Sequence, residues 1–301
     1  MFREKNLLFL HAITSVHAGS GSELGLVDLT IQREIHTGFP KIESSSLKGA
    51  VRSTVEDMLD LNNKEQENRW IETIFGKEGE KDQNNAQAGS ISFSDARILL
   101  FPVKSLRGVF AWITCPYILQ RFNNEMTLYE LNNNLLPVPA ANTISGNDII
   151  VSSVNEQTQV ILEEYTYTVT RDDTCKELAS KLQESAFPQL QNNLLGRLMV
   201  IADDDFRDFV TLSTEVNARI AINKKTGTVD KDKGALWYEE NVPPEALFYT
   251  LIFAGDSREK EKGKVAEDIV AFLQKEEVFP QVFQLGGNST LGRGMLRRIW
   301  A

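Results

Sequence analysis

A single carboxylate interrupts an apolar stretch near the start of the chain. Asp28 lies between Val27 and Leu29 in the segment GLVDLTIQRE, residues 25–34. An acid in this setting is a turn residue, a carboxylate satisfied by structural hydrogen bonds, or a group that takes part in catalysis. The local pattern does not choose between these three possibilities.

The chain has three histidines, a residue type that gives and takes protons near neutral pH. His11 falls within an apolar run, so we expect it to be packed in the core. His17 precedes a glycine-containing loop, so we expect it to be exposed beside Asp28, whereas His36 lies in a predicted loop. No pair has the spacing of zinc ligands. Composition leaves a Ser-His-Asp triad open, although no G-x-S-x-G motif is present.

The segment GGNSTLGRG, residues 286–294, holds four glycines in nine residues. Such a loop lets the backbone approach a ligand closely and present its N–H groups. The basic residues in and after the loop, including Arg297 and Arg298, would suit a phosphate backbone. The segment is neither a P-loop nor a dinucleotide-binding fingerprint. A simple irregular turn explains it equally well.

The segment SSSLKG, residues 44–49, begins the clearest helical pattern of the chain, which covers residues 44–60. Its serines are predicted to cap the helix. A helix N-terminus attracts anions through its free N–H groups and its dipole, and Lys48 and Arg52 add charge near Ser46. A plain serine cap without a ligand is the simpler alternative.

The remaining pattern indicates strands, helices and polar connections that would position these residues. An acidic run, Asp203–Asp205, is interpreted as an exposed loop rather than a metal cluster. Together the elements predict an α+β fold with insertions. The expected elements are strands at 6–17, 91–103, 108–119 (passing into a helix) and 246–255, a hairpin from 211 and a helix at 262–276.

Composition describes a globular protein of 301 residues, with 42% apolar and 25% charged residues. The sequence contains no run of 18 apolar residues, so no membrane span is predicted. The N-terminal segment is interpreted as a first strand and not as a signal peptide. Cys115 and Cys175 lie far apart, match no zinc spacing and fit a reduced, cytoplasmic compartment as core residues.

The formal net charge of −10 argues against a general nucleic-acid binder. That objection weakens if basic residues gather on one face, because phosphate contacts need clustered Lys and Arg. Such clusters are present in the sequence. They are Lys48 with Arg52, Lys224 with Lys225, and Arg293 with Arg297 and Arg298.

Four segments carry a resemblance to a known family: HAITSVHAGSG, VDLTIQREIHTGFPKIESSSLKGAVR, FSDARILLFPV and QLGGNSTLGRG. Together they resemble the RAMP superfamily of CRISPR proteins, specifically the repeated backbone subunit of the type III-B (Cmr) RNA-targeting complex. The resemblance covers most of the chain, apart from its Asn-rich middle. It implies one RAMP domain over residues 1–301, with a ferredoxin-like or RRM-like palm, inserted fingers at about 61–148 and a long β-hairpin thumb at about 211–242.

The resemblance also implies partners and an activity. The chain is expected to bind CRISPR RNA and a target single-stranded RNA, to join other Cmr subunits, and to stack head to tail with its own copies into a filament. No membrane is implied. Cleavage of the target RNA at regular intervals would rest on Asp28, which would hold a divalent metal, Mg²⁺ or Mn²⁺, while His17 could assist as acid or base.

RNA binding is implied for the two anion-site candidates. Each contributes residues that match a family motif, and a basic groove would reconcile them with the acidic composition. The implied RNA-binding residues are Ser46, Lys48, Arg52, Gly286, Gly287, Gly292, Arg293 and Gly294.

Three other hypotheses stay open at this point. The chain could be a guide-binding scaffold without cleavage activity of its own, or a repeat-processing endonuclease of the same superfamily that works without metal. It could also be an unrelated α+β domain with an anion-binding loop. The acid at position 28 favours the target nuclease over the scaffold.

Overall fold

The computed structural model of the chain describes residues 2–22, 25–59, 64–77, 86–154, 157–189, 193–220, 226–227, 236–257 and 263–301. Within these ranges helices alternate irregularly with mostly antiparallel strands, which confirms the predicted α+β class. No helix in the described ranges is both long enough and apolar enough to span a membrane.

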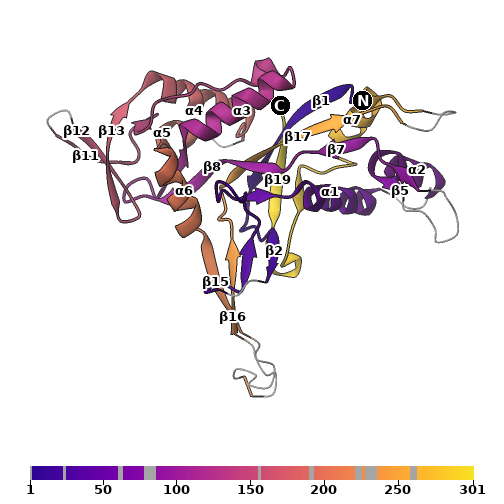
Figure 1. The fold of residues 1–301 in the computed structure, drawn as a ribbon, viewed down its shortest axis with the longest axis horizontal. Coiled ribbons are helices and arrows are strands. Elements are labelled where there is room, and N and C mark those ends of the chain that lie inside the picture. Colours follow the sequence, from indigo (N-terminus) through magenta and orange to yellow (C-terminus); the bar gives the residue numbers. More distant parts are fainter. Residues whose placement is uncertain are drawn as a thin grey trace.

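Long apolar strands form the centre of the main sheet. Strand β1 (Glu4–Ala12) pairs antiparallel with β17 (Leu247–Ala254) on one edge and with β19 (Met295–Trp300) on the other. Beyond β17 follow β8 (Ala96–Lys104) and then β9 (Phe110–Thr114). The first and last strands of the chain are therefore neighbours, and both termini lie on the same side of the molecule (Figure 1).

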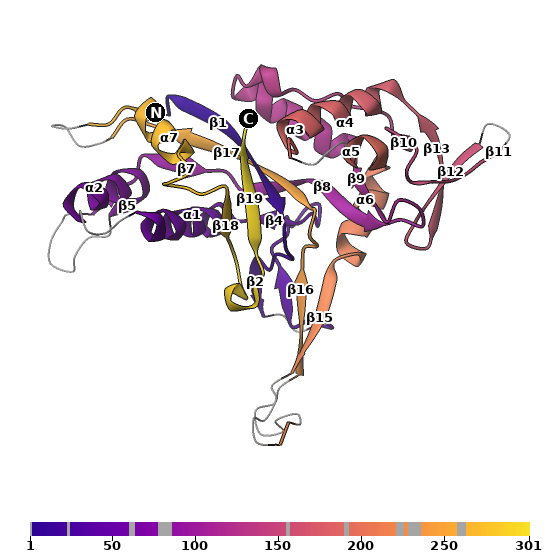
Figure 2. The ribbon, with the colours of Figure 1, turned by 180° about the vertical axis from the view of Figure 1, so that it is seen from behind.

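One end of the sheet carries a lobe of short strands and helices (Figures 1 and 2). The sheet continues from β9 through five strands to this end. These strands are β14 (Leu198–Val200), β10 (Thr143–Ile144), β13 (Tyr165–Arg171), β12 (Gln157–Leu162) and β11 (Ile150–Val154). The helices of the lobe are α3 (Pro116–Leu128), α4 (Asp173–Ser185), α5 (Asn193–Arg197) and α6 (Asp203–Leu212), with a 3₁₀ turn at Asn132–Asn134.

The opposite end of the sheet carries three helices and several short strands (Figure 1). The helices are α1 (Ser44–Met58), α2 (Lys64–Phe75) and α7 (Ala266–Gln274). The strands are β4 (Lys41–Ile42), β5 (Gly76–Lys77), β6 (Gln87–Ala88), β7 (Ile91–Phe93) and β18 (Val282–Gln284). Strand β18 pairs with β19 and ends the sheet on this side, and a 3₁₀ turn at Ser289–Leu291 joins the two.

A separate small sheet projects from the body (Figures 1 and 2). Strands β15 (Glu215–Ile220) and β16 (Leu236–Asn241) form its antiparallel hairpin, as the sequence predicts. Strand β3 (Leu29–Ile31) pairs with β16, and β2 (Gly19–Ser22) pairs with β3. The tip of the predicted hairpin lies outside the described residues, apart from residues 226–227.

Helix α1 shows how the sequence sets the packing. Leu47, Val51 and Val55 recur every four residues and are fully buried, so the predicted apolar face is confirmed. The predicted serine cap is wrong, because Glu43 holds the cap position and no side chain of that residue caps the helix. Asp95 instead accepts a hydrogen bond from the Ser44 N–H at 2.9 Å.

Other sequence predictions are confirmed in type and corrected in extent. The first strand ends at Ala12, and the strand predicted at 91–103 is divided into β7 and β8 by Ser94 and Asp95. The segment at 108–119 does pass from a strand into a helix at Pro116. The predicted acidic loop at 203–205 is wrong, since it forms the first turn of α6, where acids complement the helix dipole.

The predicted insertion at 61–148 contributes to the main sheet. Strands β7 and β8 both pair with β17, and β9 pairs with β8 and β14. Strand β10, near the end of the range, also belongs to this sheet, whereas α2, β5, β6 and α3 lie outside it in the described residues. The division of the chain into one domain with fingers at 61–148 and a thumb at 211–242 stays a prediction.

The core contains the residues that were expected there. His11 is 3% exposed, and its Nε2 lies 2.9 Å from a Glu245 carboxylate oxygen. Cys115 and Cys175 are both buried as free thiols, and burial raises the pKa of each thiol to about 12. Thiols of such high pKa are unreactive core residues.

Replacement of Leu47 by Ala tests the importance of the α1 face. Because Leu47 is fully buried, we expect the free energy of unfolding to fall by about 2–5 kcal/mol in urea denaturation. Ser53→Ala on the exposed face of the same helix is the control and should change it by less than about 0.5 kcal/mol. Equal effects of the two substitutions would contradict the packing described for α1.

Candidate functional site

Asp28 is attached to the base of the hairpin. It ends a bend directly before β3, and its backbone N–H donates to the Tyr238 carbonyl at 3.1 Å. In return the Tyr238 N–H donates to Asp28 Oδ2 at 2.7 Å. Within the described residues Oδ1 has no hydrogen-bond partner. The carboxylate is thus held by one oxygen and leaves the other for a ligand, which combines the structural and chemical readings of this acid.

His17 is attached to the same strand. Its Nδ1 lies 2.6 Å from the Glu240 carbonyl oxygen. A carbonyl can only accept, so Nδ1 carries the proton and Nε2 is left for proton transfer. Tyr238 and Glu240 are two residues apart, so the anchor points of Asp28 and His17 are separated by about 7 Å along one edge of β16. No direct contact joins the two side chains among the described interactions.

The carboxylate of Glu239 joins the hairpin to the glycine-rich loop. This side chain is 5% exposed and accepts hydrogen bonds from Asn288 at 2.7 Å and from Arg219 at 3.1 Å. Arg293 lies 3.4 Å away and completes the cluster. Burial raises the pKa of Glu239, but the hydrogen bonds from Asn288 and Arg219 outweigh it and leave the pKa below its usual value. Glu239 therefore stays ionised.

Glu240 fixes the hairpin to the strand that follows Asp28. One carboxylate oxygen accepts from the Ile31 N–H at 3.1 Å. The other accepts from Arg33 at 2.5 Å and from the Thr214 hydroxyl at 2.8 Å. A buried carboxylate is stable only with such partners. Sequence reasoning missed the structural role of Glu239 and Glu240, for which the adjacent acids within the strand segment LWYEEN were the available signal.

Much of the backbone of the glycine-rich loop is bound to the protein itself. Gly286 has φ +87°, and a Cβ atom there would lie 2.3 Å from the His17 carbonyl oxygen. The N–H groups of Gly287, Gly292, Arg293 and Gly294 all donate to backbone carbonyls of the protein. The prediction that the loop offers its N–H groups to a ligand is wrong for these four residues. Contact of the loop with RNA through other groups stays a prediction.

The basic residues after the loop do not form one face. Arg298 is buried, and it donates to the carbonyl oxygens of Phe279 and Pro280. Arg293 is paired with Glu239 inside the protein. The predicted phosphate-binding cluster of Arg293, Arg297 and Arg298 is therefore wrong as a unit, because two of its guanidinium groups satisfy internal acceptors.

The start of α1 is already occupied. Asp95 binds the Ser44 N–H, and the Gln32 side chain accepts from the Glu43 N–H at 2.7 Å. An acid next to these N–H groups takes the place that an anion would have. What remains open is a groove of about 350 Å³ along the side of the helix, where Ser46 and Gly49 face Gly286.

Lys48 and Arg52 face away from that groove. They line a second groove of about 490 Å³ together with Lys77, against β5, β6 and β7. Lys48 donates to the Ile91 carbonyl, and burial together with nearby Arg52 lowers its pKa. Arg52 is paired with Glu56 at 2.8 Å. The structure therefore brings Ser46 and Gly286 together but separates both from Lys48 and Arg52.

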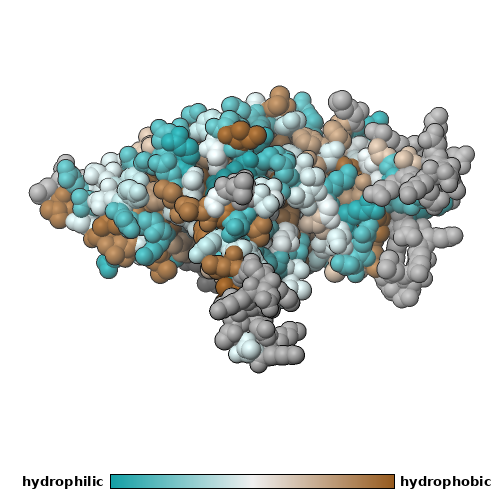
Figure 3. All heavy atoms as spheres, turned by 60° about the horizontal axis from the view of Figure 1, so that its bottom comes forward, coloured by the Kyte–Doolittle hydropathy of each residue, from teal (hydrophilic) through white to brown (hydrophobic). Residues whose placement is uncertain are grey.

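One face of the hairpin is apolar and exposed. In β15 the apolar residues of the alternating pattern point outward, whereas Arg219 and Glu215 are half-buried. Figure 3 shows hydrophobic side chains gathered beside the hairpin. The exposed apolar side chains of the two strands are Val216, Ile220, Leu236 and Tyr238. Such a projecting face fits a partner that offers flat apolar surface, as nucleobases do.

The contact of the loop with His17 can be tested by Gly286→Ala. We expect a fall in the free energy of unfolding of about 3 kcal/mol or more, because a positive φ and a clash with the His17 carbonyl both oppose a Cβ atom. Gly292→Ala is the control: its φ is +73°, but nothing lies within 4 Å of the added atom. It should cost about 1–2 kcal/mol. Equal losses in urea denaturation would show that the close approach is absent.

The chain is similar to known proteins over nearly its whole length. Residues 9–297 match the model of the RAMP superfamily. The protein named "CRISPR system Cmr endoribonuclease Cmr4" from Pyrococcus furiosus is 40% identical over 293 residues, which is 97% of this chain and 94% of that protein.

Solved structures agree with this similarity. A crystal structure of oligomeric Cmr4 from Pyrococcus furiosus is 31% identical, with a TM-score of 0.70 over 99% of this chain and 98% of that one. A chain of a type III-B Cmr-beta complex bound to cognate target RNA shares the fold, with a TM-score of 0.74 at 21% identity over 99% of this chain and 98% of that chain. The hypothesis of an unrelated α+β domain is therefore wrong. The chain belongs to the RAMP superfamily.

Proposed function

We propose that the chain is the repeated backbone subunit of a type III-B Cmr effector complex and cleaves the target RNA paired with its CRISPR RNA. Its 40% identity to a relative named as a Cmr endoribonuclease supports this function. The observation that carries the cleavage role is the placement of Asp28, fixed through Tyr238 to the base of the hairpin with one oxygen free. A cytoplasmic location is part of the proposal.

The architecture is interpreted with the same proposal. The sheet around β1, β17 and β19 is the ferredoxin-like or RRM-like palm, residues 61–148 supply the fingers, and residues 211–242 form the thumb. The exposed apolar face of the β15–β16 hairpin supports the thumb, because apolar side chains can enter between stacked bases. Copies of the chain stack head to tail and contact other Cmr subunits, which agrees with the oligomeric relative.

The guide RNA is proposed to run past α1 and the glycine-rich loop. Apart from one acid, Asp57, the groove between Ser46 and Gly286 is lined by small and uncharged polar residues, which lets a sugar-phosphate backbone approach closely. Lys48 and Arg52 line the groove on the other side of the helix and would contact a different part of the RNA. Gly287, Gly292, Arg293 and Gly294 use their N–H groups within the protein, so they would contact the guide RNA through other atoms of the loop.

Cleavage is proposed to use the ribose of the target strand. The 2′-hydroxyl attacks its own phosphate, the bond to the next 5′-oxygen breaks, and a 2′,3′-cyclic phosphate remains. Asp28 Oδ1 would hold a divalent ion near that hydroxyl and the scissile phosphate, since Tyr238 binds Oδ2. His17 Nε2 would give or take a proton, since Nδ1 is held by Glu240.

A divalent ion fits this site in part. Among the residues that the structure describes, no three His, Cys, Asp or Glu side chains gather to hold a metal by themselves. Mg²⁺ is commonly held by one or two carboxylates with substrate phosphates and water, so Asp28 would be the ligand from this chain and RNA would supply others. When bound, Mg²⁺ or Mn²⁺ would neutralise charge on the scissile phosphate.

The substitution Asp28→Asn tests the cleavage role. In the assembled complex we expect target cleavage to slow by about 100-fold or more, because the amide keeps the shape of the side chain but loses its charge. Binding of guide and target should not change. The control is Asp204→Asn, which makes the same chemical change on an acid whose side chain is 87% exposed on α6.

The outcome separates the proposal from its main alternative. Loss of cleavage with intact RNA binding supports a target nuclease. If the Asp28→Asn complex cuts like the wild type, the chain is a guide-binding scaffold and the cut is made elsewhere.

Removal of divalent ions is an independent test. With excess EDTA the assembled complex should bind RNA but stop cutting, and Mg²⁺ or Mn²⁺ should restore cleavage. Gel analysis of the labelled target measures both. Cleavage that resists EDTA would favour the alternative hypothesis of a repeat-processing nuclease that works by acid–base catalysis without metal.

A further inference from the structure

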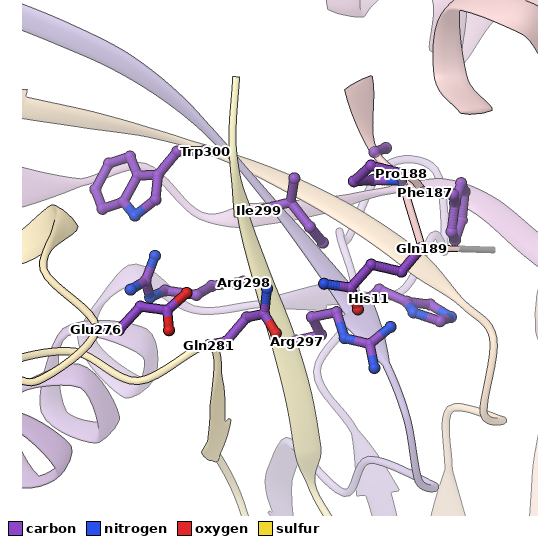
Figure 4. Close-up of a pocket in the computed structure, with 11 residues that line it drawn as sticks. His11, Phe187, Pro188, Gln189, Glu276, Gln281, Arg297, Arg298, Ile299 and Trp300 are labelled. Atoms are coloured by element: carbon purple, nitrogen blue, oxygen red, sulfur yellow. The ribbon is translucent and has the colours of Figure 1, made fainter. Parts of the chain in front are cut away.

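A small pocket lies beside the C-terminal strand, away from Asp28 and the hairpin. It has a volume of about 150 Å³ and is bounded by β19, by the segment after α4 and by residues 276–281 (Figure 4). In Figures 1 and 2 the C-terminal end of β19 and the hairpin are on opposite sides of the body. Arg297 and Arg298, which the sequence suggested for phosphate contacts, line this pocket, but no residue of the proposed RNA grooves or of the cleavage site does.

Arg297 enters the pocket without a partner. Its Nε is buried and makes no hydrogen bond, and no carboxylate lies within 4.0 Å of its guanidinium group in the described part of the chain. Every other arginine with a half-buried or buried side chain in those ranges has a carboxylate or carbonyl partner, as Arg33, Arg121 and Arg298 illustrate. A partly desolvated guanidinium without an acceptor is costly, so its position indicates an acceptor that comes from outside the chain.

Three other side chains of the pocket have N–H groups without a partner among the described residues. The indole Nε1 of Trp300 is buried without a partner. The side-chain amides of Gln189 and Gln281 also line the pocket and have no hydrogen bond among the described residues. Trp300 packs against Arg298 on the other side of β19 from Arg297 (Figure 4), and the pairing of Val282 with Arg297 puts Gln281 on the Arg298 side as well. Gln189 is therefore the polar side chain that joins Arg297, and its amide adds an N–H donor to the guanidinium group, which suits an oxyanion.

The acids near the pocket are engaged or turned away. Glu245 is bound to His11 Nε2 at 2.9 Å. His11 lies opposite Arg297 on the neighbouring strand β1. Its imidazole ring carries no negative charge, so it does not repel an anion on that side. Glu276 lies with Arg298 on the other side of β19 from Arg297 and His11 (Figure 4). An anion that binds Arg297 therefore meets one free carboxylate, at the opposite wall.

We propose that this pocket binds an oxyanion, a carboxylate or a phosphate group, with Arg297 as its charged ligand. Its volume is below the roughly 300–1,000 Å³ of pockets for drug-sized ligands, so the anion is a small molecule or the end of a side chain and not a nucleotide. The planar guanidinium group gives two parallel N–H donors, which match two oxygens of either group. The anion comes from solution or from an acidic side chain of another subunit.

The test measures the thermal unfolding of the full chain in inorganic phosphate or in acetate, against chloride at equal ionic strength. At a tenfold excess over the dissociation constant, we expect one of the two oxyanions to raise Tm by about 3 °C. Phosphate also stabilises proteins nonspecifically, so variants are compared. Arg297→Gln should lose the shift, whereas Arg171→Gln, which makes the same change on an exposed residue of β13, should keep it.

The same shift in wild type and Arg297→Gln, or no shift with either anion, would overturn the proposal. If Arg297→Gln does not fold, calorimetric titration of the wild-type chain with phosphate and with acetate decides, since absence of saturable binding to both would also overturn it. Repetition in the assembled complex distinguishes the sources. Binding that persists there indicates an anion from solution, and binding that disappears indicates that another subunit fills the pocket; both results support an oxyanion site.

Discussion

Two adjacent buried carboxylates in β16 hold the candidate site together. Glu239 binds groups from β15 and the glycine-rich loop. Glu240 binds groups from β3, the segment after β3 and the residue directly before β15. Breaking one partner of a buried pair typically costs about 3–5 kcal/mol, because the remaining charge is left in a poor environment. The hairpin therefore has one orientation relative to the bend that carries Asp28, and that orientation is set by charge rather than by apolar packing.

This arrangement explains why a strand and not a loop determines the geometry of the site. Asp28 and His17 come from separate segments, yet both are bound by backbone groups of β16. Backbone groups of a paired strand have little freedom, so a site built on them is better defined than one built on loops. The glycine-rich loop supports the backbone at His17, because Gly286 has no side chain and leaves room for the His17 carbonyl.

The sequence predicted what depends on local spacing. The buried face of α1, the apolar central strands and the alternating hairpin all follow from neighbours within about ten residues. The pairing of Glu240 with Ile31 and Arg33 could not be predicted in this way, since more than 200 residues separate the partners. The assignment of Ser46 and Lys48 to one anion site was an avoidable error. Residues two apart on a helix point to nearly opposite sides, so these two side chains could not face one groove.

The fate of the basic residues changes how an acidic chain can bind RNA. Arg293, which the sequence suggested for phosphate contacts, instead neutralises an internal acid, as Arg33 and Arg219 also do. The open groove beside α1 is lined mostly by small polar residues, and the exposed face of the projecting hairpin is apolar. In the proposed function, therefore, close backbone approach and base contact carry much of the RNA recognition by one subunit. Repetition of the subunit along the guide then supplies affinity that no single dense basic surface provides, because each added copy binds a segment already held in place by its neighbours.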